Sequence, residues 1–208
     1  MKLKKKVKRI LIILVIATAL IATTVFFVKK LTATKEVEEA KVLNTIDDYG
    51  YVLKDNKSKK YQKLFEELVG ILEKKEVDEK EYVSKISEMF IVDFYSLNDK
   101  SAKTDVGGVD FVHPSVLGNF LENAENTFYK HVESNIYNNR SQKLPTVDTV
   151  TVDSVETTSF TYGDKTDENA YLVKVNWTYA ETEFSTYQTN AAMIFVHEQN
   201  KLYLVELK

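Results

Sequence analysis

Three histidines are the side chains of this 208-residue sequence that ordinarily titrate near neutral pH, and they lie far apart in the chain. His113, His131 and His197 have no partner at the spacing of a His-Glu-x-x-His or His-x-His motif, so the sequence predicts no metal site. We instead expect that His113 caps a helix, that His131 lies on a polar helix surface and that His197 ends a strand. The absence of cysteine excludes disulfides, thiolate metal sites and cysteine nucleophiles, and no cofactor is predicted.

Other residue patterns that mark catalysis are missing as well. Asp47 and Asp48 are adjacent, so on a strand they would point to opposite faces; solvated or turn-capping carboxylates are expected. No serine stands in a G-x-S-x-G motif, the turn that exposes a hydrolase nucleophile. Asn176 begins a glycosylation sequon, but its place in a predicted strand makes this a chance match. We therefore predict no catalytic residue and no enzyme activity.

One pair of glycines is the best candidate for a functional loop. Gly107 and Gly108 interrupt residues 100–112, which predicts a tight turn. The pair lacks the G-x-x-x-x-G-K-[ST] context of a phosphate-binding loop. The turn nevertheless leads into His113 and Pro114, where a helix is predicted to begin, and helix N-termini bind anions. Gly107, Gly108 and His113 are therefore the candidate loop residues.

Three amphipathic helices are predicted to position these residues. The first covers about residues 58–75, where apolar side chains recur at intervals of three and four. Asp78 followed by Glu81 is a capping box that opens the second helix, which should end near residues 97–100 and pack against the first as a hairpin. The third is expected over residues 113–134, because a continuous apolar face runs through that segment.

Alternation with a period of two then replaces the helical pattern and predicts strands. The clearest alternation covers residues 171–179, where Tyr171 and Trp177 would lie on the same face. Further strands are expected at residues 146–162, 188–197 and 202–207. Because the turns between them are short and polar, we expect an antiparallel meander.

An earlier segment, residues 43–53, also favours extended structure. Tyrosine and valine flank Gly50 there, which predicts an edge strand or an extended segment bulged at the glycine. Three helices followed by four strands predict an α+β domain, with the helices packed on one side of a curved, cone-like antiparallel sheet.

The aromatic face of this sheet has two interpretations. Tyr171 and Trp177 most simply belong to the core, covered by Phe120 and Phe128 of the third helix. A cone-shaped fold could instead present the same face as a pocket for a small apolar ligand. Tyr171 and Trp177 are therefore the candidate pocket residues, and complete filling of their face would exclude such a pocket.

The chain begins with a pattern typical of a membrane anchor. Residues 10–28, from Ile10 to Val28, contain no charge, glycine or proline, and a helix of this length spans about 28 Å, close to the thickness of the hydrocarbon core. Six basic side chains precede the run, so the positive-inside bias predicts a cytoplasmic N-terminus and a C-terminal domain outside the cell membrane. A cleaved signal peptide is the competing interpretation, but its apolar region is ordinarily about 7 to 15 residues long.

The sequence thus predicts four parts. These are a basic tail (1–9), a transmembrane helix (10–28), a stalk and extended segment (29–57), and an extracytoplasmic domain (58–208). The stalk is either a helical continuation or a flexible linker. Nine of the 28 basic side chains precede residue 36, whereas all 31 acidic ones follow, so the outer part has a net charge of about −12. Phosphate binding needs Lys and Arg, so we predict no nucleic-acid partner.

The order of these elements resembles the extracytoplasmic domains of the nuclear-transport-factor-like superfamily. It is similar to single-pass scaffold components of conjugation and type IV secretion machines, over about residues 58–208. The resemblance rests on element order and carries over no functional residue. It implies a membrane-anchored, non-enzymatic domain that assembles with protein partners at the cell envelope. The alternative is an extracytoplasmic pocket that binds or converts a small ligand.

Overall fold

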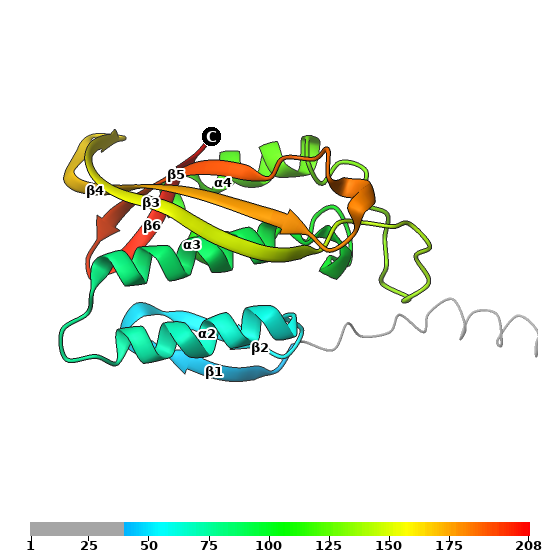
Figure 1. Ribbon diagram of the computed structural model, residues 1–208, viewed down its shortest axis with the longest axis horizontal. Coiled ribbons are helices and arrows are strands. Elements are labelled where there is room, and N and C mark those ends of the chain that lie inside the picture. Colours follow the sequence, from blue (N-terminus) through cyan, green and yellow to red (C-terminus); the bar gives the residue numbers. More distant parts are fainter. Residues whose placement is uncertain (1–39) are drawn as a thin grey trace, which may run out of the picture. The chain divides into compact units, whose positions relative to one another are not determined.

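The structure, a computed structural model, describes residues 40–208 (Figure 1). The predicted basic tail and membrane helix, residues 1–28, and residues 29–39 of the predicted stalk lie outside the described residues. The transmembrane helix therefore remains a prediction. Among residues 40–208, no helix combines the length and the apolar character needed to cross a membrane.

Residues 41–208 form an α+β domain, as predicted, in which three α-helices precede a four-stranded antiparallel sheet. The strands hydrogen-bond in chain order, β3-β4-β5-β6, which confirms the meander. Two-residue turns join β3 to β4 and β5 to β6, and such turns return the chain beside the strand it has just left. The elements are α2 (Lys59–Leu72), α3 (Glu79–Tyr95), α4 (Pro114–Asn126), β3 (Val147–Tyr162), β4 (Lys165–Tyr179), β5 (Asn190–Glu198) and β6 (Lys201–Leu207).

Side-chain caps fix where the first two helices begin. The Ser58 hydroxyl caps α2, and the Asp78 carboxylate accepts hydrogen bonds from the backbone N–H groups of Lys80 (2.8 Å) and Glu81 (3.2 Å) at the start of α3. The predicted cap at Asp78 is therefore confirmed. Glu81 does not complete the box, because its carboxylate pairs with Lys74 instead.

The helices form two layers rather than one. Helix α3 covers the inner face of the sheet, and α2 lies on the side of α3 that faces away from the sheet (Figure 1). The apolar stripe of α2 is buried against α3, so the expected packing of all three helices on the sheet does not hold for α2. Helix α4 lies beside the edge strand β6, where the His113 N–H donates to the Leu204 carbonyl (2.9 Å).

Residues 41–54 differ from the single bulged segment expected there. They form a hairpin of β1 (Val42–Ile46) and β2 (Tyr51–Lys54), joined by a 3₁₀ turn. Gly50 follows that turn with a φ of 66°, a left-handed conformation that glycine adopts without steric cost. The glycine therefore reverses the chain, and β2 buries Tyr51 and Leu53 in the core.

The inner face of the sheet forms the core with α3. Val173, Val175 and Trp177 alternate on β4 and are almost completely buried, as the period of two predicts. The Tyr95 ring, at the end of α3, covers Trp177 with ring centroids 4.3 Å apart. Trp177 is therefore a core residue, and Tyr95 separates it from the space beneath α4.

Helix α4 ends at Asn126, well before the predicted end near residue 134. Thr127 leaves the helical conformation, with φ −121° and ψ −91°, and this turns the buried Tyr129 inward. The Tyr129 hydroxyl donates to the Phe94 carbonyl (2.6 Å). A helix continued to residue 134 could not make this tertiary contact, which the local apolar pattern does not reveal.

Strand β3 continues to Tyr162, with register shifts that let the β3–β4 hairpin curl (Figure 1). The curl covers a second, smaller apolar cluster built around Ala170, Ile194 and Val196. It also brings the Tyr162 hydroxyl to the His197 carbonyl of β5 (3.3 Å). The hairpin thus covers part of the outer face of its own sheet.

Candidate functional site

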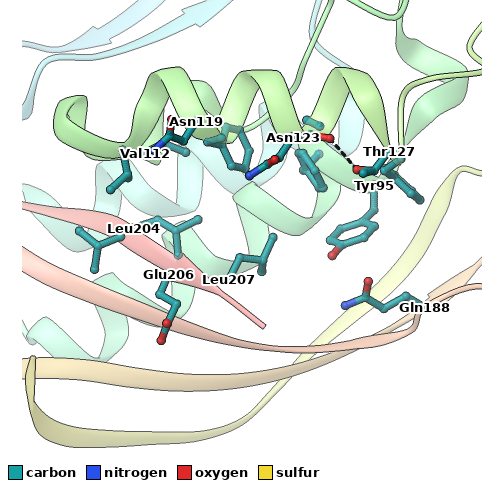
Figure 2. A pocket seen from close by; sticks show the side chains of 15 residues that line it. Tyr95, Val112, Asn119, Asn123, Thr127, Gln188, Leu204, Glu206 and Leu207 are labelled. Atoms are coloured by element: carbon teal, nitrogen blue, oxygen red, sulfur yellow. Dashed lines mark hydrogen bonds between the residues drawn. The ribbon is translucent and has the colours of Figure 1, made fainter. Parts of the chain in front are cut away.

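A cavity of about 460 Å³ lies between α4 and β6. Figure 2 shows α4 along one side of it and β6 along the other, with Gln188 near the end where Tyr95 lies. Its volume falls in the range of small-molecule pockets, roughly 300 to 1,000 Å³. The cavity is therefore the candidate functional site of the described residues.

Most side chains that line the cavity are apolar. They come from the end of α3, from α4 and its flanking residues, and from β6. Such walls favour an apolar ligand body, because binding removes both surfaces from water. The apolar lining residues are Phe94, Val112, Val116, Phe120, Ala124, Phe128, Leu204, Val205 and Leu207.

Three amide side chains add polar groups to these walls. Asn119 and Asn123 are four residues apart, so both lie on the face of α4 that lines the cavity. Within residues 40–208 neither side chain has a hydrogen-bond partner, so each amide can offer donors and an acceptor to a ligand. Gln188 lies across the cavity, and its Nε2 donates to the Asn190 carbonyl (2.8 Å).

The Tyr95 hydroxyl points into the space between Leu207 and Gln188 (Figure 2). No hydrogen bond to this hydroxyl is found in the described part of the chain. Burial, followed by the neighbouring Tyr179, raises the pKa of Tyr95 well above its ordinary value of 10.0. The hydroxyl therefore stays protonated at neutral pH and can donate to a ligand.

The charge of the side chains that line the cavity disfavours an anionic ligand. Glu206 is the lining side chain that is charged at neutral pH, and its carboxylate pairs with Lys208 (2.7 Å). No lysine or arginine is among the described residues that line the cavity. A phosphate or carboxylate would lose its hydration here without gaining a counter-charge, which is costly. The cavity therefore suits a neutral molecule.

The two predicted pocket residues do not line this cavity. Tyr171 donates its hydroxyl hydrogen to Glu79 (2.8 Å); burial, and then this bond, raises the pKa of Tyr171 to about 12. Trp177 lies beneath the Tyr95 ring. The cavity thus adjoins the predicted aromatic face rather than occupying it, and a pocket formed by Tyr171 and Trp177 remains a prediction.

The predicted loop glycines pack against the end of α3. The Gly108 N–H donates to the Asp93 carboxylate (2.8 Å), and the Gly107 N–H donates to the Tyr129 hydroxyl (3.1 Å). Both glycines are buried. The backbone donors that an anion would need are therefore already bonded within the protein.

His113 caps α4, as predicted. Its Nδ1 accepts a hydrogen bond from the Ser115 N–H (3.1 Å), which uses one of the donors at the start of the helix. Its Nε2 lies 3.7 Å from a carboxylate oxygen of Glu198. An anion at this helix start would be repelled by the Glu198 carboxylate. His113 therefore acts here as a structural helix cap.

Asp93 is the centre of a buried cluster that the sequence analysis missed. Its carboxylate pairs with Lys57 (2.7 Å) and Lys100 (2.8 Å) and accepts the Gly108 N–H. Burial alone would raise the pKa of Asp93, but Lys100 and Lys57 outweigh it and lower the value to about 2. The sequence does contain one sign of this cluster, because Asp93 lies within the apolar stripe of α3. Because every group is paired, the cluster is structural.

His197 also has partners that its position in the sequence does not reveal. Its Nδ1 lies 2.8 Å from an oxygen of Asp167, and its Nε2 lies 3.4 Å from an oxygen of Glu79. Within residues 40–208, no group of three or more His, Asp or Glu side chains is placed to hold a metal ion. The contacts therefore link the start of α3 to the sheet.

Comparison with known proteins adds no identification. No protein-family model, no curated protein and no solved structure matches this chain. The function is therefore inferred from the cavity and from the residues that line it.

Proposed function

We propose that this protein is a membrane-anchored, non-enzymatic binding protein of the cell envelope, which holds a neutral and mainly apolar small molecule between α4 and β6. The observation that carries the proposal is the cavity of about 460 Å³, with apolar walls, unbonded Asn119 and Asn123 amides and an unbonded Tyr95 hydroxyl. The Asn119 and Asn123 residues are exposed, so their amides are free to bond a ligand that enters the cavity, and the Tyr95 hydroxyl can do the same.

The polar groups also indicate which ligand class the cavity selects. Asn119 and Asn123 lie about 6 Å apart along the helix axis, and each amide matches a group that both donates and accepts, such as a carboxamide. The Tyr95 hydroxyl donates to a carbonyl oxygen and stays protonated because its pKa is raised. A neutral aromatic or alicyclic carboxamide therefore fits the walls and the polar groups together.

Benzamide and benzoate provide a direct test, because they have nearly the same shape and differ in charge. We expect full-length protein in nanodiscs to bind benzamide at least tenfold more tightly than benzoate, as measured by saturation-transfer NMR. A tenfold preference corresponds to about 1.4 kcal/mol. Equal binding of the two compounds, or binding of neither, would contradict the proposal.

Two asparagines on α4 provide a matched pair of variants. Asn123→Leu removes a lining amide, whereas Asn126→Leu changes an exposed amide on the same helix that does not line the cavity. We expect Asn123→Leu to weaken benzamide binding several-fold and Asn126→Leu to leave it unchanged. The same loss in both variants would show that binding does not occur in the cavity.

The location is the second part of the proposal and is supported by the apolar run of residues 10–28 and the basic side chains before it. The chain has no cysteine, so Asp164→Cys, in the exposed turn between β3 and β4, gives one labelling site. We expect a membrane-impermeant maleimide to label this variant in intact cells. Labelling that requires cell lysis would place the domain on the other side of the membrane.

Assembly with envelope proteins is the second candidate function. It is favoured by β1, an edge strand of the hairpin whose Val42 and Leu43 side chains are more than half exposed. An exposed strand edge is a template for pairing with another chain. Pull-down of the solubilised full-length protein tests this candidate, and recovery of a lone monomer would speak against it.

A further inference from the structure

The connection from α4 to β3 presents two large apolar side chains to solvent. Tyr137 is 73% exposed and Ile136 is 51% exposed, although both are of a size usually buried. Residues 130–143, here called the α4–β3 loop, contain no helix or strand. Adjacent exposed apolar side chains of this kind mark a contact surface more often than single ones do.

The α4–β3 loop is held in place by its own hydrogen bonds. The Arg140 guanidinium donates to the carbonyls of Lys100 (2.8 Å), Asn98 (2.8 Å) and Glu133 (3.2 Å). The Asn135 N–H donates to the Ser101 carbonyl (2.7 Å). These bonds tie the loop to residues 98–101, which follow α3, so the exposure of the apolar pair is a consequence of the folded structure.

The loop lies at the end of the domain where the described chain begins. Figure 1 shows the start of β1, the yellow-green α4–β3 loop and the orange connection from β4 to β5 at this same end. Lys143 pairs with Glu183 of the orange connection (3.3 Å), and Lys60 of α2 donates to the Val147 carbonyl at the start of β3 (3.0 Å). The orange connection adds a third exposed large apolar side chain, Tyr187.

The charge of the loop differs from that of the surrounding domain. Lys130, Arg140 and Lys143 outnumber Glu133 within the loop, although Lys143 also pairs with Glu183 of the neighbouring connection. The outer part of the protein as a whole is strongly acidic. Basic side chains beside aromatic and aliphatic ones are typical of segments that lie in the interface of a membrane with anionic lipids.

We propose that this end of the domain rests on the outer surface of the lipid bilayer, with Ile136 and Tyr137 in the headgroup region. The inference depends on the proposed anchor at residues 10–28. Twelve residues, 29–40, connect that run to the described domain, and twelve residues reach at most about 40 Å. The point at which the chain enters the domain therefore lies no more than about 40 Å from the bilayer, and the α4–β3 loop with its apolar pair is at that same end of the domain.

Site-specific labelling tests the contact. Asn139→Cys places a fluorescent NBD label in the loop without altering Ile136 or Tyr137, and Asp164→Cys places the same label in the turn at the opposite end of the β3–β4 hairpin. In nanodiscs that contain anionic lipid and headgroup spin-labelled lipid, we expect the label at 139 to be quenched at least threefold more than the label at 164. The double change Ile136→Ser and Tyr137→Ser should remove that difference.

The possible results separate the two proposals. Failure of the full-length protein to enter nanodiscs overturns both the anchor and the bilayer contact. Incorporation with equal quenching at 139 and 164 overturns the bilayer contact alone, and a different partner then covers the loop. Quenching at 139 that persists after the double change overturns the assigned role of Ile136 and Tyr137.

Discussion

At the scale of single residues, the buried Asp93 carboxylate pairs with two lysines, the buried Lys100 and the partly buried Lys57. Asp93→Asn keeps the shape of the side chain but leaves Lys57 and Lys100 without their anion, and breaking a buried pair costs about 3 to 5 kcal/mol. We expect a loss of unfolding free energy of this order at pH 7, followed by the fluorescence of Trp177, the one tryptophan. Asp110→Asn, at an exposed carboxylate, is the control and should change stability by less than about 0.5 kcal/mol.

The same carboxylate predicts a pH dependence. The pKa of Asp93 in the folded protein is about 2, below its ordinary value of 3.8. A lowered pKa stabilises the fold fully above the ordinary value, and this contribution is lost as the pH falls from about 4 toward 2. We expect stability to decline over this interval more steeply in the unmodified protein than in Asp93→Asn. Parallel pH profiles would show that Asp93 does not contribute to acid unfolding.

Substitutions of two glycines by alanine test two different effects on stability, close packing at Gly107 and helix propensity at Gly118. A Cβ at Gly107 would overlap the carbonyl of Asp93, whereas a Cβ at Gly118 on α4 would meet open space. Gly107→Ala should therefore destabilise the protein by roughly 1 to 3 kcal/mol, and Gly118→Ala should stabilise it by about 0.5 to 1 kcal/mol. Thermal unfolding measures both changes. A harmless Gly107→Ala would show that the loop can move away from α3 at little cost.

At the scale of elements, Asp167 joins β4 to β5 and, through His197, to α3. It accepts hydrogen bonds from the His197 N–H (2.7 Å), the His197 ring (2.8 Å) and the Asn169 N–H (2.9 Å). Burial would raise the pKa of Asp167, but the bonds from His197 and Asn169 lower it. Asp167→Asn should therefore cost about 1 to 3 kcal/mol at pH 7, and less as the pH falls below the ordinary carboxylate range. Urea unfolding measures this, with the exposed Asp164→Asn as control.

The sequence predicts those elements whose ends depend on local chemistry. Asp78 begins α3 because its carboxylate bonds the first free N–H groups, and the alternation of residues 171–179 appears in β4 because one face is buried. The end of α4 depends instead on Tyr129, which bonds the distant carbonyl of Phe94. Local alternation predicts one edge strand or extended segment bulged at Gly50, because the pairing of β1 with β2 cannot be read from it.

The candidate site was harder to predict than the fold. The apolar side of the third helix is visible in the sequence, and Asn119 and Asn123 lie beside it at a spacing of four. Their meaning depends on β6, which lies about 80 residues further along the chain and forms the opposite wall. Asp93 and His197 likewise acquire their roles from partners on other elements. Chemistry that depends on tertiary packing leaves no spacing pattern to read.

At the scale of the whole molecule, the chain divides into two units, of which Lys41–Lys208 is the described one. The members of its main buried cluster all lie between Tyr51 and Leu204, so the cavity and its walls need no residue before Lys41. We expect residues 41–208 alone to fold with an unfolding free energy within about 1 kcal/mol of that of the full chain, because the apolar burial that stabilises the fold is retained.

The isolated domain should keep its ligand preference and lose its stable attachment to the membrane. Benzamide should bind it as tightly as it binds the full chain, because every lining residue is present, and flotation with vesicles should decrease because the apolar run of residues 10–28 is gone. Exposed side chains such as Tyr137 would then leave at most a weak, salt-sensitive attachment to anionic vesicles. Lost benzamide binding in a folded 41–208 domain would mean that residues before Lys41 help to form the site, and the cavity between α4 and β6 would no longer explain the function.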